Sequence, residues 1–199
     1  MPETPPITHL LYLHGFRSSP QSFKARRLGA WLQAHRPEVH WACPQLPPSP
    51  REAVALAGRL VADWPRDRMA VVGSSLGGFY ATVIAESIGC PAALLNPAVD
   101  PARDLSAHIG EQAFFHDPDR HFFFRPEFVD ELQRLRPVAL TRLHRYFAVI
   151  AKGDEVLDWR DMAARYDGAQ ILLLEGSDHS LTDFDTHLPP LLKFLGLTP

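Results

Sequence analysis

The stretch MAVVGSSLGGFY, residues 69–80, joins a short apolar run to a cluster of small residues and then to a second apolar run. Met69 to Val72 has the length and composition of a buried strand, and Phe79 to Ile88 those of a helix. Between them, Gly73 to Gly77 follows the pattern G-x-S-x-G, which in this context is typical of a sharp turn that raises its central serine above the sheet edge. Glycines suit so tight a turn because they carry no side chain. The stretch therefore predicts an exposed, reactive hydroxyl at Ser75.

The same pentapeptide also fits a glycine-rich helix start that only packs tightly, because short motifs recur by chance. The wider chain favours the first interpretation. Apolar runs predict strands at residues 9–13, 41–43, 69–72, 91–95, 146–151 and 170–174. Helices are predicted at residues 19–36, 49–64, 79–88, 158–166 and 188–195, the last begun by two prolines. This alternation predicts an α/β fold, a mostly parallel sheet with helices on both faces.

The alternation breaks at about residues 100–138, so we expect a single domain, residues 1–199, with a small inserted helical cap. Five phenylalanines of the cap lie within eleven residues, Phe114, Phe115, Phe122, Phe123 and Phe124. They fit two hypotheses equally well: rings that anchor the cap to the sheet, or rings that line an apolar pocket above Ser75. The segment His116 to His121 contains metal-capable side chains, but its proline and arginine favour a solvated turn, and no metal site is predicted.

A serine nucleophile needs a base and an acid to orient it. His179 follows the strand that ends at Leu174, and Asp154 follows the strand one earlier in the chain, so both are expected at the sheet edge that carries Ser75. The chain order Ser75, Asp154, His179 is that of α/β-hydrolases. Asp178 is a weaker candidate for the acid because the side chains of adjacent residues diverge. Asp158 resembles a helix N-cap.

The loop after the first strand supplies the remaining candidates. An oxyanion hole needs two backbone N–H donors, and Phe16 and Leu76 are the predicted pair, with Gly15 permitting close approach. His14 is expected to make hydrogen bonds within its loop, because His179 already fills the place of the base. Arg17 could bind an anionic group of a substrate, although a surface salt bridge is the commoner role of such an arginine.

Four segments together resemble the YqiA-like esterases, which are small α/β-hydrolases, and the resemblance covers nearly the whole chain. These segments are Tyr12–Pro20, Gly73–Ala81, Leu95–Ala98 and Gly153–Val156. The resemblance implies hydrolysis of carboxylic esters or of acyl-CoA thioesters, with Ser75, Asp154 and His179 matching the family's triad. The candidate substrate contacts are Arg17, Tyr80, Phe114, Phe115, Phe122 and Phe123.

Composition narrows the classes of partner. The chain has 199 residues, 46% of them apolar, and 20 basic and 23 acidic residues spread along it give a net charge of −3. This pattern predicts neither nucleic-acid binding nor a membrane surface patch, and no apolar run approaches the ~20 residues that span a bilayer. Two distant cysteines favour reduced thiols and a cytoplasmic location. We expect a small ester or thioester as the partner and no cofactor.

Alternatives remain within and beyond the esterases. A thioesterase or a peptidase would use the same three residues, because a serine triad serves all acyl transfers. A haloalkane dehalogenase would need aspartate in place of Ser75. A ligand-binding protein without catalysis could also be built on this fold, since fold alone does not fix function. Loss of a triad member would favour that interpretation, and none is lost here.

Overall fold

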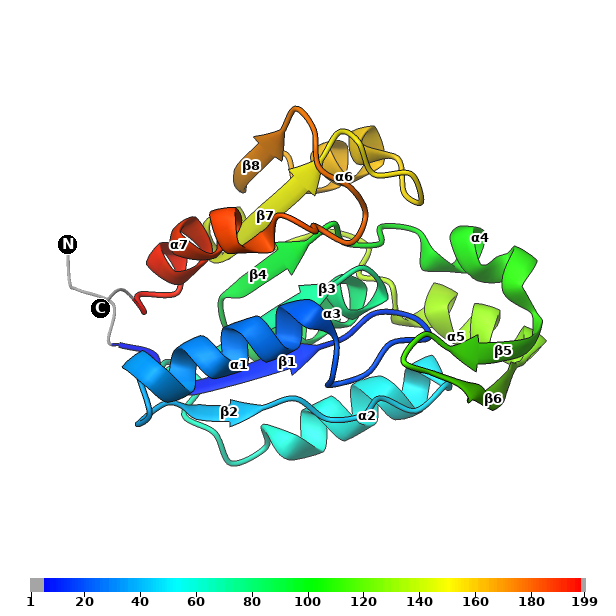
Figure 1. The fold of residues 1–199 in the computed structure, drawn as a ribbon, viewed down its shortest axis with the longest axis horizontal. Helices are drawn as coiled ribbons and strands as arrows, with labels where there is room; N and C mark the ends of the chain where they lie inside the picture. Colours follow the sequence, from blue (N-terminus) through cyan, green and yellow to red (C-terminus); the bar gives the residue numbers. More distant parts are fainter. Residues whose placement is uncertain (1–5, 198–199) are drawn as a thin grey trace.

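Strand β3 (Met69–Ser74) lies inside a parallel sheet whose order, in the described residues 6–197 of this computed structural model, is β2-β1-β3-β4-β7-β8 (Figure 1). The other strands are β1 (His9–Leu13), β2 (His40–Ala42), β4 (Ala92–Leu95), β7 (Tyr146–Ala151) and β8 (Gln170–Leu174). The predicted parallel α/β sheet is therefore confirmed. Residues 1–5 and 198–199, the ends of the predicted single domain, lie outside the described residues.

Helices cover both faces of the sheet. Their bounds are α1 (Phe23–His35), α2 (Pro50–Leu60), α3 (Leu76–Ile88), α4 (Pro101–Leu105), α5 (Pro126–Leu135), α6 (Trp159–Arg165) and α7 (Phe184–Phe194), with short 3-10 turns at Ser106–His108 and Leu143–Arg145. Alternate residues of each strand point to opposite faces. Leu10 and Tyr12 of β1 therefore pack with α1 and α7, whereas Leu11 and Leu13 pack with α2 and α3. No helix among residues 6–197 has the length and apolar character to cross a membrane.

Three helix starts differ from the sequence prediction. Helix α1 begins at Phe23 rather than near Ser19, and α3 begins at Leu76, directly after the glycine-rich turn. Helix α7 begins at Phe184, so that Pro189 and Pro190 lie inside it rather than at its start. Proline breaks one helical hydrogen bond, which is why the sequence favours a boundary there. Burial of Phe184 against the sheet face holds the turn that precedes the prolines.

The cap segment, residues 101–135, contains a β-hairpin that was predicted as helix. Strands β5 (Gly110–Phe114) and β6 (Asp117–Phe124) pair antiparallel between α4 and α5, beyond the end of β3 (Figure 1). In β6, Phe124 is buried, Phe123 is exposed and Phe122 is half-buried, which is the two-residue period of a strand. Three consecutive phenylalanines hide that period in the sequence. The cap, predicted to be helical, is therefore mixed, with the helices α4 and α5 on either side of a hairpin in the chain.

Candidate active site

Ser75 occupies the turn between β3 and α3 in a backbone conformation that L-residues rarely adopt, with φ 55° and ψ −121°. The turn closes only because its neighbours are small. A Cβ added at Gly77 would lie 2.0 Å from the carbonyl oxygen of Leu13, and one at Gly73 would lie 2.1 Å from that of Gly77. The strained backbone points the Ser75 hydroxyl away from α3, at the carboxyl end of the sheet.

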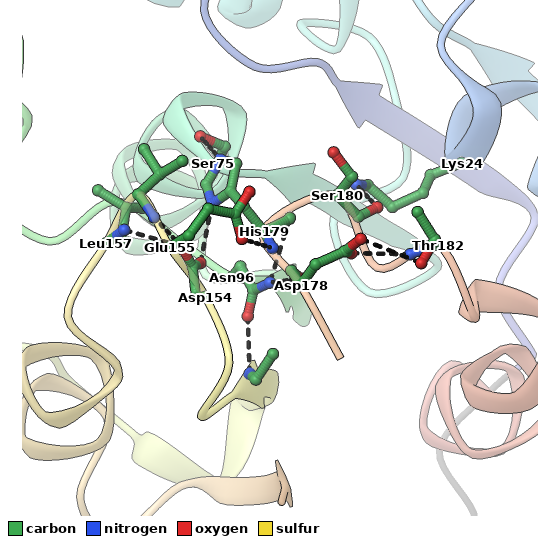
Figure 2. A network of polar contacts seen from close by, with 12 residues as sticks. Lys24, Ser75, Asn96, Asp154, Glu155, Leu157, Asp178, His179, Ser180 and Thr182 are labelled. Atoms are coloured by element: carbon green, nitrogen blue, oxygen red, sulfur yellow. Dashed lines mark hydrogen bonds and ion pairs between the residues drawn. The ribbon is translucent and has the colours of Figure 1, made fainter. Parts of the chain in front are cut away.

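Three side chains meet at this edge, as Figure 2 shows. His179 lies with Nε2 3.0 Å from Oγ of Ser75 and with Nδ1 2.8 Å from Oδ2 of Asp154. An ionised carboxylate only accepts hydrogen bonds, so Nδ1–H of His179 donates to Asp154 and the free Nε2 accepts from the Ser75 hydroxyl. The chain of hydrogen bonds can therefore draw the proton from Ser75 onto the imidazole.

Asp154 is held in place from two directions. Its side chain has no exposed surface, and its Oδ1 accepts hydrogen bonds of 2.8 Å from the backbone N–H groups of Val156 and Leu157. The competing acid Asp178 instead accepts from the backbone N–H and the hydroxyl of Thr182. Asp158 caps α6 by accepting from the N–H of Arg160. Of the three aspartates considered, Asp154 is therefore the one that contacts the imidazole.

The two candidate oxyanion donors lie beside the serine. Leu76 is the first residue of α3, and Phe16 follows Gly15, at which a Cβ would lie only 3.2 Å from that of Ser75. Neither N–H donates a hydrogen bond to another group within residues 6–197. The partial positive charge of a helix N-terminus adds to the donor at Leu76. The site can thus offer two backbone donors to an oxygen that gains negative charge.

His14 has both ring nitrogens occupied. Its Nδ1–H donates to the carbonyl of Gly15 at 3.0 Å, and its Nε2 accepts from the N–H of Leu46 at 3.0 Å. Burial lowers the pKa of His14 to about 4, so the ring is neutral near pH 7. These contacts join two loops and leave His14 no free nitrogen for a substrate.

Asn96, to which the sequence analysis gave no role, joins the loops of the site. It is fully buried at the end of β4 with φ 42°. Its Oδ1 accepts from the N–H of Ala151 at 2.8 Å, and its Nδ2 donates to the carbonyl oxygens of Asp178 at 3.0 Å and His179 at 3.2 Å (Figure 2). Asn96 therefore positions the loop of His179 relative to β7, after which Asp154 follows.

The candidate substrate contacts separate into different places. Phe115 lines a cavity of about 440 Å³ that contains Ser75 and His179. Arg17 follows Phe16 in the loop after β1. Its Nε donates to the carbonyl of Ala113, and its guanidinium lies 4.4 Å from the Phe115 ring. These two contacts tie Arg17 to the cap segment. The cation that lines the cavity is Lys24, which the sequence analysis missed.

The remaining candidates do not line that cavity. Tyr80, Phe114 and Phe122 surround a hollow of only about 30 Å³ beside Phe16 and Leu76. Phe123 is 58% exposed and lies in a groove between β6 and α2, away from the serine. Of the five clustered phenylalanines, Phe114, Phe115 and Phe122 to Phe124, Phe115 is the one that borders the cavity of the serine, so the five share no single pocket above Ser75.

Solved structures similar to this chain are α/β hydrolases. Alpha/beta hydrolase domain-containing protein 10 from mouse matches with a TM-score of 0.64 at 14% identity, over 94% of this chain and 90% of its own. A structure titled for LipS and LipT, two metagenome-derived lipolytic enzymes, matches with a TM-score of 0.66 at 18% identity, over 97% and 96%. Est1E from Butyrivibrio proteoclasticus matches with a TM-score of 0.64 at 14% identity, over 96% and 89%.

These similarities confirm the predicted α/β-hydrolase fold over nearly the whole chain. The four segments that resemble the YqiA-like esterases lie between β1 and the loop after β7. A protein-family model matches a longer part of the chain, from residue 9 in β1 to residue 196 beyond α7. The model is that of the uncharacterised protein family UPF0227, and this chain belongs to that YqiA-like family.

Proposed function

We propose that this protein is a serine hydrolase that cleaves carboxylic esters through an acyl intermediate on Ser75. The observation that carries the proposal is the continuous hydrogen-bonded path from Ser75 through His179 to Asp154. A structural serine has no need of such a path, whereas an attacking serine needs a base to take its proton. The hydrolase and lipolytic neighbours described above support the same class of reaction.

The first half of the reaction forms the acyl-enzyme. His179 Nε2 takes the proton of the Ser75 hydroxyl while Oγ bonds to the carbonyl carbon of the ester, and the carbonyl oxygen gains the negative charge. The N–H groups of Phe16 and Leu76 donate to that oxyanion. As the carbonyl re-forms, the bond to the leaving oxygen breaks and His179 gives its proton to the departing alcohol. Asp154 stabilises the imidazolium and fixes its tautomer throughout.

The second half repeats these steps with water. His179 takes a proton from a water molecule whose oxygen bonds to the acyl carbon, and the bond to Ser75 Oγ then breaks as Oγ recovers the proton. The product is a carboxylic acid, and the enzyme returns to its starting state. A thioester would follow the same path with a thiol as leaving group, so the leaving atom has to be settled by assay.

A fluorophosphonate probe followed by peptide mass spectrometry tests the nucleophile. Only an activated hydroxyl beside an oxyanion hole attacks such a phosphorus centre quickly, so we expect label on Ser75 alone. Ser74→Ala is the matched control, because Ser74 is adjacent and lines the same cavity. We expect Ser74→Ala to be labelled and Ser75→Ala to be inert. Label on Ser74, or ester hydrolysis by Ser75→Ala, would falsify the proposal.

Two substitutions of aspartate by asparagine test which aspartate orients His179. Asp154→Asn should lower kcat for ester hydrolysis by on the order of 10⁴, because an amide at this position favours the wrong imidazole tautomer. Asp178→Asn should have a much smaller effect, since its carboxylate accepts hydrogen bonds from Thr182 and makes none with the imidazole of His179. The measurement is kcat for steady-state hydrolysis of oxygen and sulfur esters with acyl chains of graded length. The same assay shows whether the wild-type protein prefers an oxygen or a sulfur leaving group. A larger loss in Asp178→Asn contradicts the assignment.

A further inference from the structure

The cavity at Ser75 has an apolar and a polar lining. The rings of Phe16, Phe23 and Phe115 are apolar, and the polar wall includes Lys24 from the first turn of α1 and Ser180 and Thr182, which follow His179. In a serine hydrolase the imidazole protonates the leaving oxygen, so the space beside His179 receives the leaving group. The oxyanion donor Phe16 borders both this cavity and the smaller hollow, whereas Leu76 borders only the hollow, and His179 and Ser180 border only the cavity. Because His179 gives its proton to the leaving group, the leaving group faces the cavity of about 440 Å³.

Lys24 brings a positive charge into this wall. Its Nζ donates to the carbonyl of Ser180, the residue after His179 (Figure 2). An ammonium has three N–H donors, so two remain for another partner. Among residues 6–197 no carboxylate forms an ion pair with Lys24, although the charges of Asp178 and Asp154 favour its protonated form. Burial nevertheless lowers the pKa of Lys24 to about 8, as expected of a poorly solvated cation.

Hydroxyl groups gather beside the same cavity. Tyr12 is fully buried, and its hydroxyl and that of Ser22 have almost no surface exposed to solvent. Both residues line the cavity, and the Tyr12 hydroxyl lies beside those of Ser22 and Ser74. Burial raises the pKa of Tyr12, so it stays a neutral donor. Buried hydroxyls are nearly always paired, and these three lie close enough to donate to one another beside the cation, which adds polar character to this part of the cavity lining.

The start of α1 adds backbone donors to this wall. Ser22 is its N-cap, and no side chain accepts from the N–H groups of the first turn. These groups and the helix dipole favour an anion. Resting on the proposed esterase function, we propose that this cavity binds the alcohol part of an ester that carries a carboxylate or phosphate group, with the anion paired to Lys24 and accepting from the backbone N–H groups at the start of α1.

Pairs of esters that differ only in charge test whether the cavity binds an anion, and whether that anion belongs to the leaving group or to the acyl group. Acetate esters of glycolate, 3-hydroxypropanoate and 4-hydroxybutanoate place a carboxylate on the leaving group, and their primary amides are the neutral counterparts. The acetate ester of 3-hydroxypropyl phosphate tests phosphate. Methyl hydrogen succinate and methyl succinamate place the same difference on the acyl side. The readout is the ratio of kcat/KM for the charged and the neutral member of each pair.

Comparing this ratio between variants cancels the intrinsic reactivity of the esters. Lys24→Gln should reduce the ratio about tenfold for the best leaving-group pair, the size expected of one charge-assisted hydrogen bond. The acyl-side ratio should stay the same. Arg26→Gln is the control, because it removes an equal charge from the exposed side of the same helix. An unchanged ratio in Lys24→Gln, an equal change in Arg26→Gln, or an effect confined to the acyl-side pair overturns the inference.

A binding measurement separates this inference from the proposed function. Calorimetric titration of Ser75→Ala with 4-acetoxybutanoate and with its amide needs no turnover. We expect the anion to bind about tenfold more tightly, and Lys24→Gln in this background to remove the difference. Equal binding of anion and amide overturns the anion site even if esters are hydrolysed. Preferential anion binding together with a wild-type protein that hydrolyses no ester supports the anion site and overturns the esterase proposal instead.

Discussion

Replacing Asn96 tests whether one buried side chain holds the loops of the candidate site together. Its amide makes three hydrogen bonds: from the N–H of Ala151 in β7, to the carbonyl of Asp178, and to the carbonyl of His179. Alanine removes all three and adds no new partner. Its φ of 42° is also a conformation that asparagine tolerates better than alanine.

The expected loss of stability follows from these groups. The N–H of Ala151 is buried and would be left without an acceptor, which costs about 1–3 kcal/mol. Each of the two half-buried carbonyls would lose a hydrogen bond worth about 1 kcal/mol, and the positive φ would add about 1 kcal/mol for alanine. We therefore expect Asn96→Ala to lower the free energy of unfolding by about 4–6 kcal/mol. For a chain of this size that is a fall in Tm of about 10–20 °C.

Two further variants separate the hydrogen-bond contribution from the backbone contribution. The stability of each variant is measured by urea unfolding with near-UV circular dichroism. Asn96→Gly loses the same hydrogen bonds but tolerates the positive φ, so it should be about 1 kcal/mol more stable than Asn96→Ala. Asn96→Asp keeps an acceptor for Ala151 but sets a carboxylate against two carbonyl oxygens. In the folded fraction of Asn96→Ala at low temperature, fluorophosphonate labelling of Ser75 should slow at least tenfold, because the loop of His179 loses its anchor. A loss below 1 kcal/mol with unchanged labelling would refute the reasoning.

Four other perturbations have defined outcomes. The pKa of His14 is lowered to about 4 by burial, whereas an unfolded histidine titrates near about 6.5, so the unfolded chain binds more protons between these values. The free energy of unfolding should therefore fall by up to about 3 kcal/mol as pH drops from 6.5 to 4, and urea titrations should show a flatter profile in His14→Gln. Phe124→Ala should cost about 3–5 kcal/mol in thermal unfolding, since Phe124 is only 1% exposed. Phe115→Ala, 68% exposed at the cavity, should leave Tm within about 2 °C and change ester preference. Gly77→Ala should yield little folded protein in a solubility assay, because its Cβ would lie 2.0 Å from the Leu13 carbonyl oxygen.

The sheet and the three meeting side chains were predictable because each depends on local signals. Short apolar runs bounded by small residues give the strands, and parallel strands bring the loops at their carboxyl ends to one edge. Ser75, Asp154 and His179 each follow such a strand, β3, β7 and β8. Adjacent parallel strands lie about 5 Å apart, and only β4 lies between β3 and β7, so the loops that follow β3, β7 and β8 can reach one another at this edge.

The hairpin of the cap segment was not predictable in the same way. Its strand β6 is polar in its first half and carries three consecutive phenylalanines in the second, so neither a two-residue nor a 3.6-residue period is visible. In the structure the three rings differ in the residues that they contact. Phe124 packs 5.2 Å from the Phe16 ring, Phe122 packs 5.8 Å from it, and Phe123 remains exposed. Tertiary contact, rather than local pattern, decides which rings are buried.

The two cations near the site show why its binding chemistry is harder to predict than its triad. Arg17 adjoins the oxyanion loop in sequence, but its guanidinium contacts a carbonyl 96 residues away and a ring of the cap segment. Lys24 has no motif around it and reaches the site only because α1 packs beside α7, which brings it to a carbonyl 156 residues away. A triad is fixed by which strand each residue follows, whereas a binding wall is fixed by which helices pack together. Substrate preference in this chain should therefore respond to substitutions in the first turn of α1, a segment that none of the motifs includes.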